Sequence, residues 1–217
     1  MIKIHGLILS PFVRKVMAVA KLKKLPYKNV KVFPGTKTAD FLSMSPLGKI
    51  PALEDGTLRI SDSAVICEYL EEKYDDTTIR PASIEDRAQS RWLEVYGDSK
   101  LTELCVGGIY FERFAKKLLG FGETDQDKVT LTIEKLLPPQ QDYLERILPA
   151  EGFLLGDFGM ADICVASPFL SAAHVGYKPD AARWPKLAKF IEQVRAHEAM
   201  AELIDDEEAL YSSLSKA

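Results

Sequence analysis

The first 77 residues alternate short apolar stretches with short helical repeats. Ile2 to Leu7 and Tyr27 to Phe33 have the apolar, β-branched pattern of strands. Between them, Ser10-Pro11 puts a hydroxyl at a cap position and a proline at the first helical position, which predicts a helix start. The apolar residues that follow recur at i, i+3, i+4 and i+7, the spacing of one helix face: Val13, Val16, Met17 and Ala20.

The next segment adds a short helix, a hairpin and a third helix. A short helix is expected around Phe41–Met44, and two strands, Pro51–Leu53 and Leu58–Ile60, flank an Asp-Gly turn at residues 54–57. A helix is predicted to start at Asp62-Ser63. The order βαβ, short helix, ββα predicts a small mixed sheet with helices packed on it.

The chain turns polar from Tyr74 to Pro81, and no clear strand pattern follows. We therefore predict a mixed α/β domain over residues 1–77, a linker over 78–84 and an all-α domain over 85–217. The predicted helical segments are Glu85–Leu119 with a bend or interruption near Gly107-Gly108, Asp125–Leu148 with a kink or restart at Pro138-Pro139, Ala161–Ala173, Pro185–His197 and Glu198–Leu214.

Composition fits a globular protein of 217 residues, 47% hydrophobic and 28% charged. The apolar runs fall short of the roughly 20 residues that cross a bilayer, and the N-terminus lacks the layout of a signal peptide. The cysteines lie far apart, without a CxxC pair, which disfavours a disulfide framework or a structural zinc site: Cys67, Cys105 and Cys164. We therefore expect a cytoplasmic protein with no membrane partner and no bound metal.

Charge divides the chain unevenly. Residues 1–77 carry 12 basic and 9 acidic side chains, net +3, and the rest carry 16 and 23, net −7. The overall charge of −4 argues against nucleic acid as a partner. Two units with different roles are expected.

Four patterns, in order along the chain, resemble the glutathione S-transferase family. They are the strand-to-helix turn Ser10–Val16, the stretch Ser45–Leu53 before the third strand, the helix start within Ile60–Leu70, and Gly156–Ile163. The resemblance implies a thioredoxin-like βαβαββα domain followed by an all-helical bundle. It also implies a detoxifying transferase that uses glutathione as co-substrate and forms a homodimer.

The resemblance makes Ser10 the candidate catalytic residue. A serine before a helical proline is commonly only a cap. A free cysteine thiol has a pKa of about 8.5, so its reactive thiolate is a minor species at neutral pH. A hydroxyl that donates a hydrogen bond to the glutathione sulfur, near a positive helix N-terminus, lowers that pKa.

The resemblance also implies the glutathione-binding residues. It places a cis-proline at Pro51, so that the backbone of Ile50 pairs with the cysteinyl part of glutathione. Asp62 suits the γ-glutamyl ammonium and Ser63 its carboxylate, although both also suit a helix cap. Lys49, within a family motif, and Lys37 are candidates for the glycyl carboxylate, and isolated surface lysines are the alternative.

Several other residues receive an expectation. Phe12, Tyr110 and Phe114 are candidates for the electrophile site, although the spacing of Tyr110 and Phe114 also fits a helix core. Arg14 is expected to form an ion pair with the second domain, and the acidic run at residues 205–208 to face solvent. Asp162 is expected to accept a backbone N–H, with Gly159 in place of the usual hydroxyl residue of a capping box.

The turn at Ser10 also restricts the class of transferase. It holds no cysteine, no tyrosine lies in the first 26 residues, and a Ser-Ser-Cys turn is absent. The serine-type members, bacterial and theta-like or phi- and tau-like, are therefore the nearest match. The alternatives are a regulatory or binding protein on the same fold with little turnover, and a glutathione-dependent disulfide reductase or peroxidase.

Overall fold

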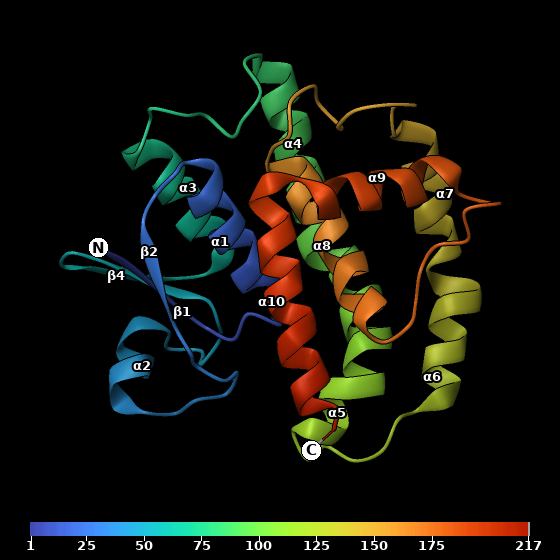
Figure 1. Ribbon diagram of the computed structural model, residues 1–217, viewed down its shortest axis with the longest axis horizontal. Helices are drawn as coiled ribbons and strands as arrows, with labels where there is room; N and C mark the ends of the chain where they lie inside the picture. The colour runs from blue at the N-terminus through green and yellow to red at the C-terminus, as the bar shows by residue number, and fades with distance from the viewer. Residues whose placement is uncertain (217) are drawn as a thin grey trace. The chain divides into compact units, whose positions relative to one another are not determined.

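The computed structural model describes residues 1–216, and their first part forms a four-stranded sheet with the order β2-β1-β3-β4 (Figure 1). The strands are β1 Ile2–His5, β2 Tyr27–Val30, β3 Ala52–Asp55 and β4 Leu58–Ser61. Strand β1 pairs parallel with β2 and antiparallel with β3, and β3 and β4 form a hairpin. The predicted mixed sheet is confirmed.

Three helices accompany the sheet, in the predicted order: α1 Pro11–Leu22, α2 Ala39–Met44 and α3 Ser63–Lys73. Strand β2 is shorter than predicted, because it ends at Val30 and not at Phe33. The carbonyl of Phe33 accepts the N–H and the hydroxyl of Thr36, so the chain turns there before α2.

In the rest of the described chain, up to residue 216, the regular elements are helices joined by loops, and one isolated bridge pairs Phe153 with Gly156. Its elements are α4 Ile84–Tyr96, η1 Gly97–Ala115, α5 Lys116–Leu118, α6 Gln126–Leu131, η2 Thr132–Leu136, α7 Pro138–Ile147, α8 Met160–His174, α9 Pro185–Ala196 and α10 Glu198–Leu214. The predicted restart at Pro138 is confirmed. Within residues 1–216, no helix is long and apolar enough to cross a membrane.

The predicted interruption near Gly107-Gly108 is wrong, because η1 runs through both residues as a π-helix; the change of helix type falls at Gly97, and a bend at the two glycines stays a prediction. Close packing explains two of these glycines. A Cβ on Gly97 would lie 2.3 Å from the carbonyl oxygen of Cys164 on α8, and one on Gly108 would lie 2.6 Å from Oγ1 of Thr132 on η2. The glycines therefore allow η1 to approach its neighbours.

Contacts group the described chain into two units. The first holds residues 1–79 and 198–207, and the second holds residues 80–197 and the remainder of α10. The domain boundaries expected from the sequence stay a prediction. The grouping adds that the N-terminal part of α10 belongs with the sheet unit.

A buried ion pair joins α1 to that part of α10. Arg14 Nε donates to Glu207 Oε1 at 2.7 Å, Nη2 donates to Oε2, and the two side chains are 0% and 1% exposed. The expectation of an ion pair for Arg14 is confirmed, and its partner lies on α10. The expectation that residues 205–208 all face solvent is wrong for Glu207, because the charge of Arg14 compensates for its burial.

We expect Glu207→Gln to lower the free energy of unfolding by about 3 kcal/mol, because it removes the carboxylate charge beside a buried guanidinium. Asp206→Asn changes the neighbouring exposed carboxylate and serves as the control, with an expected effect within about 0.5 kcal/mol. Urea denaturation of both variants measures the difference. Equal losses would contradict the assigned burial.

The two adjacent glycines of η1 offer a second test. Gly108→Ala is expected to cost about 1–3 kcal/mol, because its Cβ overlaps Thr132. Gly107→Ala is the control, since the nearest atom to its Cβ lies 3.9 Å away. Adding Thr132→Ala to Gly108→Ala removes the two closest atoms and should recover part of the loss. Denaturation that shows no recovery would refute the contact.

Candidate functional site

The strand register brings three predicted segments to one end of the sheet. Ala52 on β3 pairs with His5 on β1 and with Ser61 on β4. Continuing that register puts Ile50-Pro51 beside the segment after β1 and beside Asp62-Ser63 after β4. The candidate residues from three separate parts of the sequence therefore lie at the same edge.

Gly6 is the point where these segments approach most closely. A Cβ on Gly6 would lie 2.4 Å from Cγ2 of Val13 and 3.3 Å from Cβ of Ile50. Gly6 therefore lets the first turn of α1 and the residue before Pro51 both pack against the end of β1. Any side chain at this position would overlap Val13 of α1 and crowd Ile50.

Ser10 lies at the N-cap of α1 with an extended backbone, φ −81° and ψ 126°. Its carbonyl accepts the N–H of Arg14 and its own N–H donates to the carbonyl of Leu7. Its side chain makes no capping hydrogen bond. The hydroxyl is half-buried at a helix N-terminus and has no hydrogen-bond partner among residues 1–216. The local structure therefore holds the backbone of Ser10 and leaves its hydroxyl for another group.

The Ile50-Pro51 peptide bond is cis, as predicted. Ile50 is half-buried, and its N–H and carbonyl take no part in the backbone hydrogen bonds of residues 1–216. Its side chain packs against the cluster of Phe41, Met44 and Ala52. Ile50 is thus held by apolar contacts, with both backbone groups free to pair with an extended peptide.

Asp62 is the N-cap of α3 and has a φ of +80°, a conformation that few residues other than glycine adopt. Its Oδ1 accepts the N–H groups of Ala64 at 2.9 Å and Val65 at 3.2 Å. Oδ2 makes no hydrogen bond within the described chain, so the capping role leaves one oxygen for a cation. Ser63 follows with a buried side chain at the first helical position.

The candidate lysines belong to a loop that is closed by hydrogen bonds at its two ends. The N–H of Gly35 donates to the carbonyl of Gly48 at 3.1 Å, and Ser45 Oγ donates to the carbonyl of Lys49. Lys37 lies two residues after Gly35, and Lys49 directly follows Gly48. Both lysines are exposed. Neither has a carboxylate partner in the part of the chain that the structure describes.

The candidates for the electrophile site are divided between the two units. Phe12 lies on α1 and is half-buried, with Nζ of Lys15 5.8 Å from its ring centroid. Tyr110 and Phe114 lie on η1, only 6% and 8% exposed, with ring centroids 5.5 Å apart. Both are therefore part of the interior of the second unit, and their contact with an electrophile stays a prediction.

Two further aromatic residues, Tyr211 and His174, lie close to Tyr110 and Phe114, and the sequence analysis did not identify them. Tyr211 on α10 lies 4.6 Å from Phe114 and 5.6 Å from His174 on α8, centroid to centroid, and His174 also approaches Tyr110. The spacing within each helix gave no signal for this cluster, because it joins three helices distant in sequence.

Asp162 fulfils its expected structural role in the second unit. Oδ2 accepts the N–H of Gly159 at 3.0 Å and Oδ1 that of Leu154 at 2.9 Å. Gly159 has no side chain, so only this half of a capping box forms. Burial raises the pKa of Asp162 to about 6, against the opposing effect of these N–H donors.

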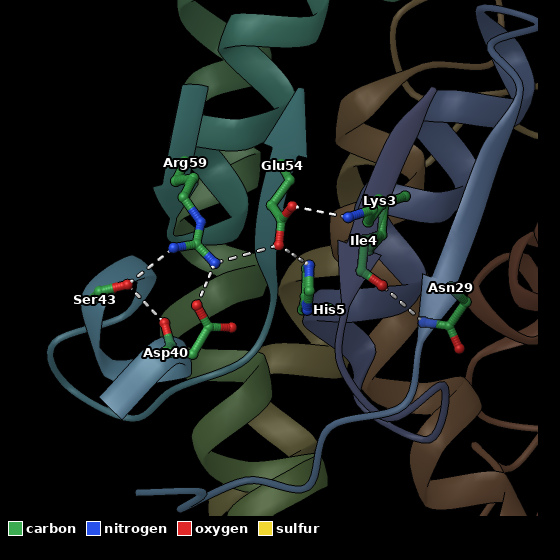
Figure 2. Close-up of polar contacts among 8 residues, drawn as sticks. All are labelled: Lys3, Ile4, His5, Asn29, Asp40, Ser43, Glu54 and Arg59. Carbon is green, nitrogen blue, oxygen red and sulfur yellow. Dashed lines mark hydrogen bonds and ion pairs between the residues drawn. The ribbon is translucent and has the colours of Figure 1, made fainter. Parts of the chain in front are cut away.

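Charged side chains of β1, β3 and β4 form a network across the sheet (Figure 2). Glu54 lies between Lys3, whose Nζ donates to Oε2 at 3.1 Å, and His5, whose Nε2 is 2.9 Å from Oε1. Burial lowers the pKa of His5 more than the Glu54 carboxylate raises it. Arg59 connects Glu54 to α2, and sequence reasoning missed it. The Asp-Gly hairpin could have indicated it, since that turn pairs Glu54 with Arg59 across β3 and β4.

Comparison with known proteins agrees with this architecture. The model of the glutathione S-transferase N-terminal domain matches residues 4–78. Glutathione S-transferase 3 of Zea mays is 34% identical over 167 residues, which cover 74% of this chain and 73% of the relative. A glutathione S-transferase of Hyoscyamus muticus is 31% identical over 168 residues, covering 74% and 77%.

A solved structure shows the same fold over nearly the whole chain. The crystal structure of a glutathione S-transferase from Rhodospirillum rubrum F11 superposes with a TM-score of 0.85 and 25% identity, covering 94% of this chain and 91% of the other. A thioredoxin-like domain followed by a helical region is thereby confirmed. The chain belongs to the glutathione S-transferase family, and the expected enzyme class is confirmed at that level.

The two oxygens of Asp62 allow its roles to be separated. Asp62→Asn retains an oxygen that can accept the N–H groups of Ala64 and Val65 and tolerates positive φ, but removes the charge. We expect a free energy of unfolding within about 0.5 kcal/mol of wild type. Glutathione affinity should fall about tenfold if the carboxylate binds the ammonium.

Asp62→Ala is the comparison variant, because it removes both roles and should also lose about 1 kcal/mol of stability. Denaturation and calorimetric titration with glutathione measure the two effects. Unchanged affinity in Asp62→Asn would assign Asp62 to the cap alone.

Proposed function

We propose that this chain conjugates the glutathione thiolate to small hydrophobic electrophiles, with the Ser10 hydroxyl as the hydrogen-bond donor to the sulfur. The observation that carries the proposal is the unused hydroxyl of Ser10 at the N-terminus of α1. A serine that serves only as a cap donates or accepts within its own helix, and this one does neither. Family membership supplies glutathione as the co-substrate.

The reaction needs a thiolate, and the site offers two influences that stabilise one. The hydroxyl can donate to the sulfur, and the N-terminus of α1 carries a partial positive charge that favours an anion. Both lower the pKa of a bound thiol from its usual value of about 8.5. The sulfur then attacks the electrophilic carbon, and the leaving group departs with its electron pair.

Glutathione binding is proposed along the sheet edge described above. The N–H and carbonyl of Ile50, before Pro51, pair with the cysteinyl residue. Asp62 Oδ2 accepts from the γ-glutamyl ammonium, and Ser63 with the first turn of α3 receives the γ-glutamyl carboxylate. Lys37 and Lys49 neutralise the glycyl carboxylate. Phe12, Tyr110 and Phe114 are the proposed contacts of the electrophile.

The remaining expectations concern the setting of the enzyme. A homodimer and a role in detoxification stay predictions from the family resemblance, and a cytoplasmic location stays a prediction from the cysteine pattern. The alternatives use the same site: a binding or regulatory protein would hold glutathione without turnover, and a disulfide reductase or peroxidase would turn over a different second substrate. No residue contact favours either alternative over conjugation.

Ser10→Ala tests the proposal. We expect kcat for conjugation of an aromatic halide to fall by about 10²–10³, the usual loss when one donor to a developing anion is removed. Glutathione affinity should change little, because the other contacts remain. Stability should also be retained, since the hydroxyl makes no bond in the fold.

Ser10→Thr retains the hydroxyl and is the matched control, with an expected rate well above that of Ser10→Ala. Steady-state kinetics and calorimetry supply both readouts. An unchanged rate in Ser10→Ala would remove Ser10 from its role. A wild-type protein that binds glutathione without turning over would favour a binding function, and no glutathione binding would refute the proposed enzyme.

A further inference from the structure

The closed loop between Gly35 and Gly48 is attached to the sheet at two places, and the two differ in chemistry. This loop contains the candidate ligand Lys37 and α2, and the second candidate, Lys49, directly follows it. The first attachment is apolar: Phe41 and Met44 of α2 pack with Ala52, against Val32 and Ile50. Because Ile50 belongs to this cluster, a shift of α2 reaches the glutathione site directly.

The second attachment is a single guanidinium. Arg59 Nη2 donates to Asp40 Oδ1 at 2.8 Å and Nη1 donates to Ser43 Oγ at 3.1 Å (Figure 2). Ser43 Oγ in turn donates to the carbonyl of Asp40 at 2.7 Å. One side chain of β4 therefore holds the first turn of α2 through two residues three positions apart. Arg59 holds the pKa of the Asp40 carboxyl below its usual value, chiefly through this hydrogen bond.

The arginine is itself held from the sheet side. Its Nη2 lies 3.5 Å from Oε1 of Glu54, the cross-strand partner of Arg59 in the hairpin. Glu54 is shared with Lys3 and His5 on β1, so the carboxylate is fixed by two strands (Figure 2). The guanidinium of Arg59 therefore links Glu54 of the sheet to Asp40 and Ser43 of α2.

We propose that Arg59 is a positioning residue for glutathione: it holds α2 so that the loop presents Lys37 and Lys49 to the glycyl carboxylate. The inference rests on the proposed function. Arg59 touches neither lysine in the structure and acts through Asp40 and Ser43. A residue that only supports the fold would affect every glutathione-like ligand equally, whereas this role affects the glycyl end.

The test compares glutathione with γ-glutamylcysteine, which lacks the glycyl residue. Calorimetric titration of Arg59→Gln should show glutathione binding weakened by roughly three- to tenfold. Binding of γ-glutamylcysteine should change by less than about twofold, since no glycyl carboxylate is left to be positioned. In conjugation assays, KM for glutathione should rise while kcat stays near wild type.

Three further variants make the comparison specific. Arg59→Lys keeps the charge and one donor direction and should recover part of the affinity. Asp40→Asn combined with Arg59→Gln should weaken binding less than the sum of the single changes, because both act through one contact. Arg183→Gln removes an exposed arginine that pairs with Asp142 in the second unit, and should leave both affinities unchanged.

The outcomes separate the inference from the proposed function. Suppose that wild type binds glutathione. If Arg59→Gln binds it equally well, or if its affinities for glutathione and γ-glutamylcysteine fall by the same factor, the positioning role is overturned while the proposed function stands. If wild type binds neither peptide, the proposed function fails and the inference fails with it. Thermal unfolding of Arg59→Gln should shift by only a few degrees, as for an exposed ion pair.

Discussion

The site depends on one constraint, the pairing register of β1, β3 and β4. Ala52 pairs with His5 on one side and with Ser61 on the other. The segment before β3 therefore meets the segments after β1 and after β4 at one edge of the sheet. Gly6 completes the arrangement, because a hydrogen there allows Val13 of α1 and Ile50 to approach the end of β1. A shift of one residue would turn every side chain to the opposite face and separate Ser10, Ile50 and Asp62.

Around this edge, the fold leaves polar groups unused. The hydroxyl of Ser10, the backbone of Ile50 and one oxygen of Asp62 have no partner among the described residues, although each lies where the chain is well held. Two buried charged residues elsewhere show the opposite: Arg14 is paired with Glu207, and Asp162 accepts two backbone N–H groups. Residues 1–77, with a net charge of +3, contain the proposed contacts for an anionic peptide, and two of their cations, Lys37 and Lys49, have no carboxylate partner within residues 1–216.

Much of this could be predicted from sequence, because the relevant signals are local. The cap and proline at Ser10-Pro11, the Asp-Gly hairpin and the restart at Pro138 act within a few residues, and the structure contains each of them. The errors concern long-range packing. Whether Glu207 faces solvent depends on Arg14, 193 residues away, and the need for a glycine at position 108 depends on Thr132 of another helix. The role inferred for Arg59 is predictable only in part. The hairpin predicts its contact with Glu54, whereas its contact with Asp40 on α2 depends on long-range packing.

The central claim is that Ser10 stabilises a thiolate, and the pKa of bound glutathione tests it most directly. Ultraviolet difference spectroscopy across a pH series measures the thiolate absorbance of glutathione in the complex. We predict a pKa below the usual value of about 8.5 in wild type, and a rise back toward that value in Ser10→Ala. Equal pKa values in the two proteins, with glutathione bound to both, would contradict the account.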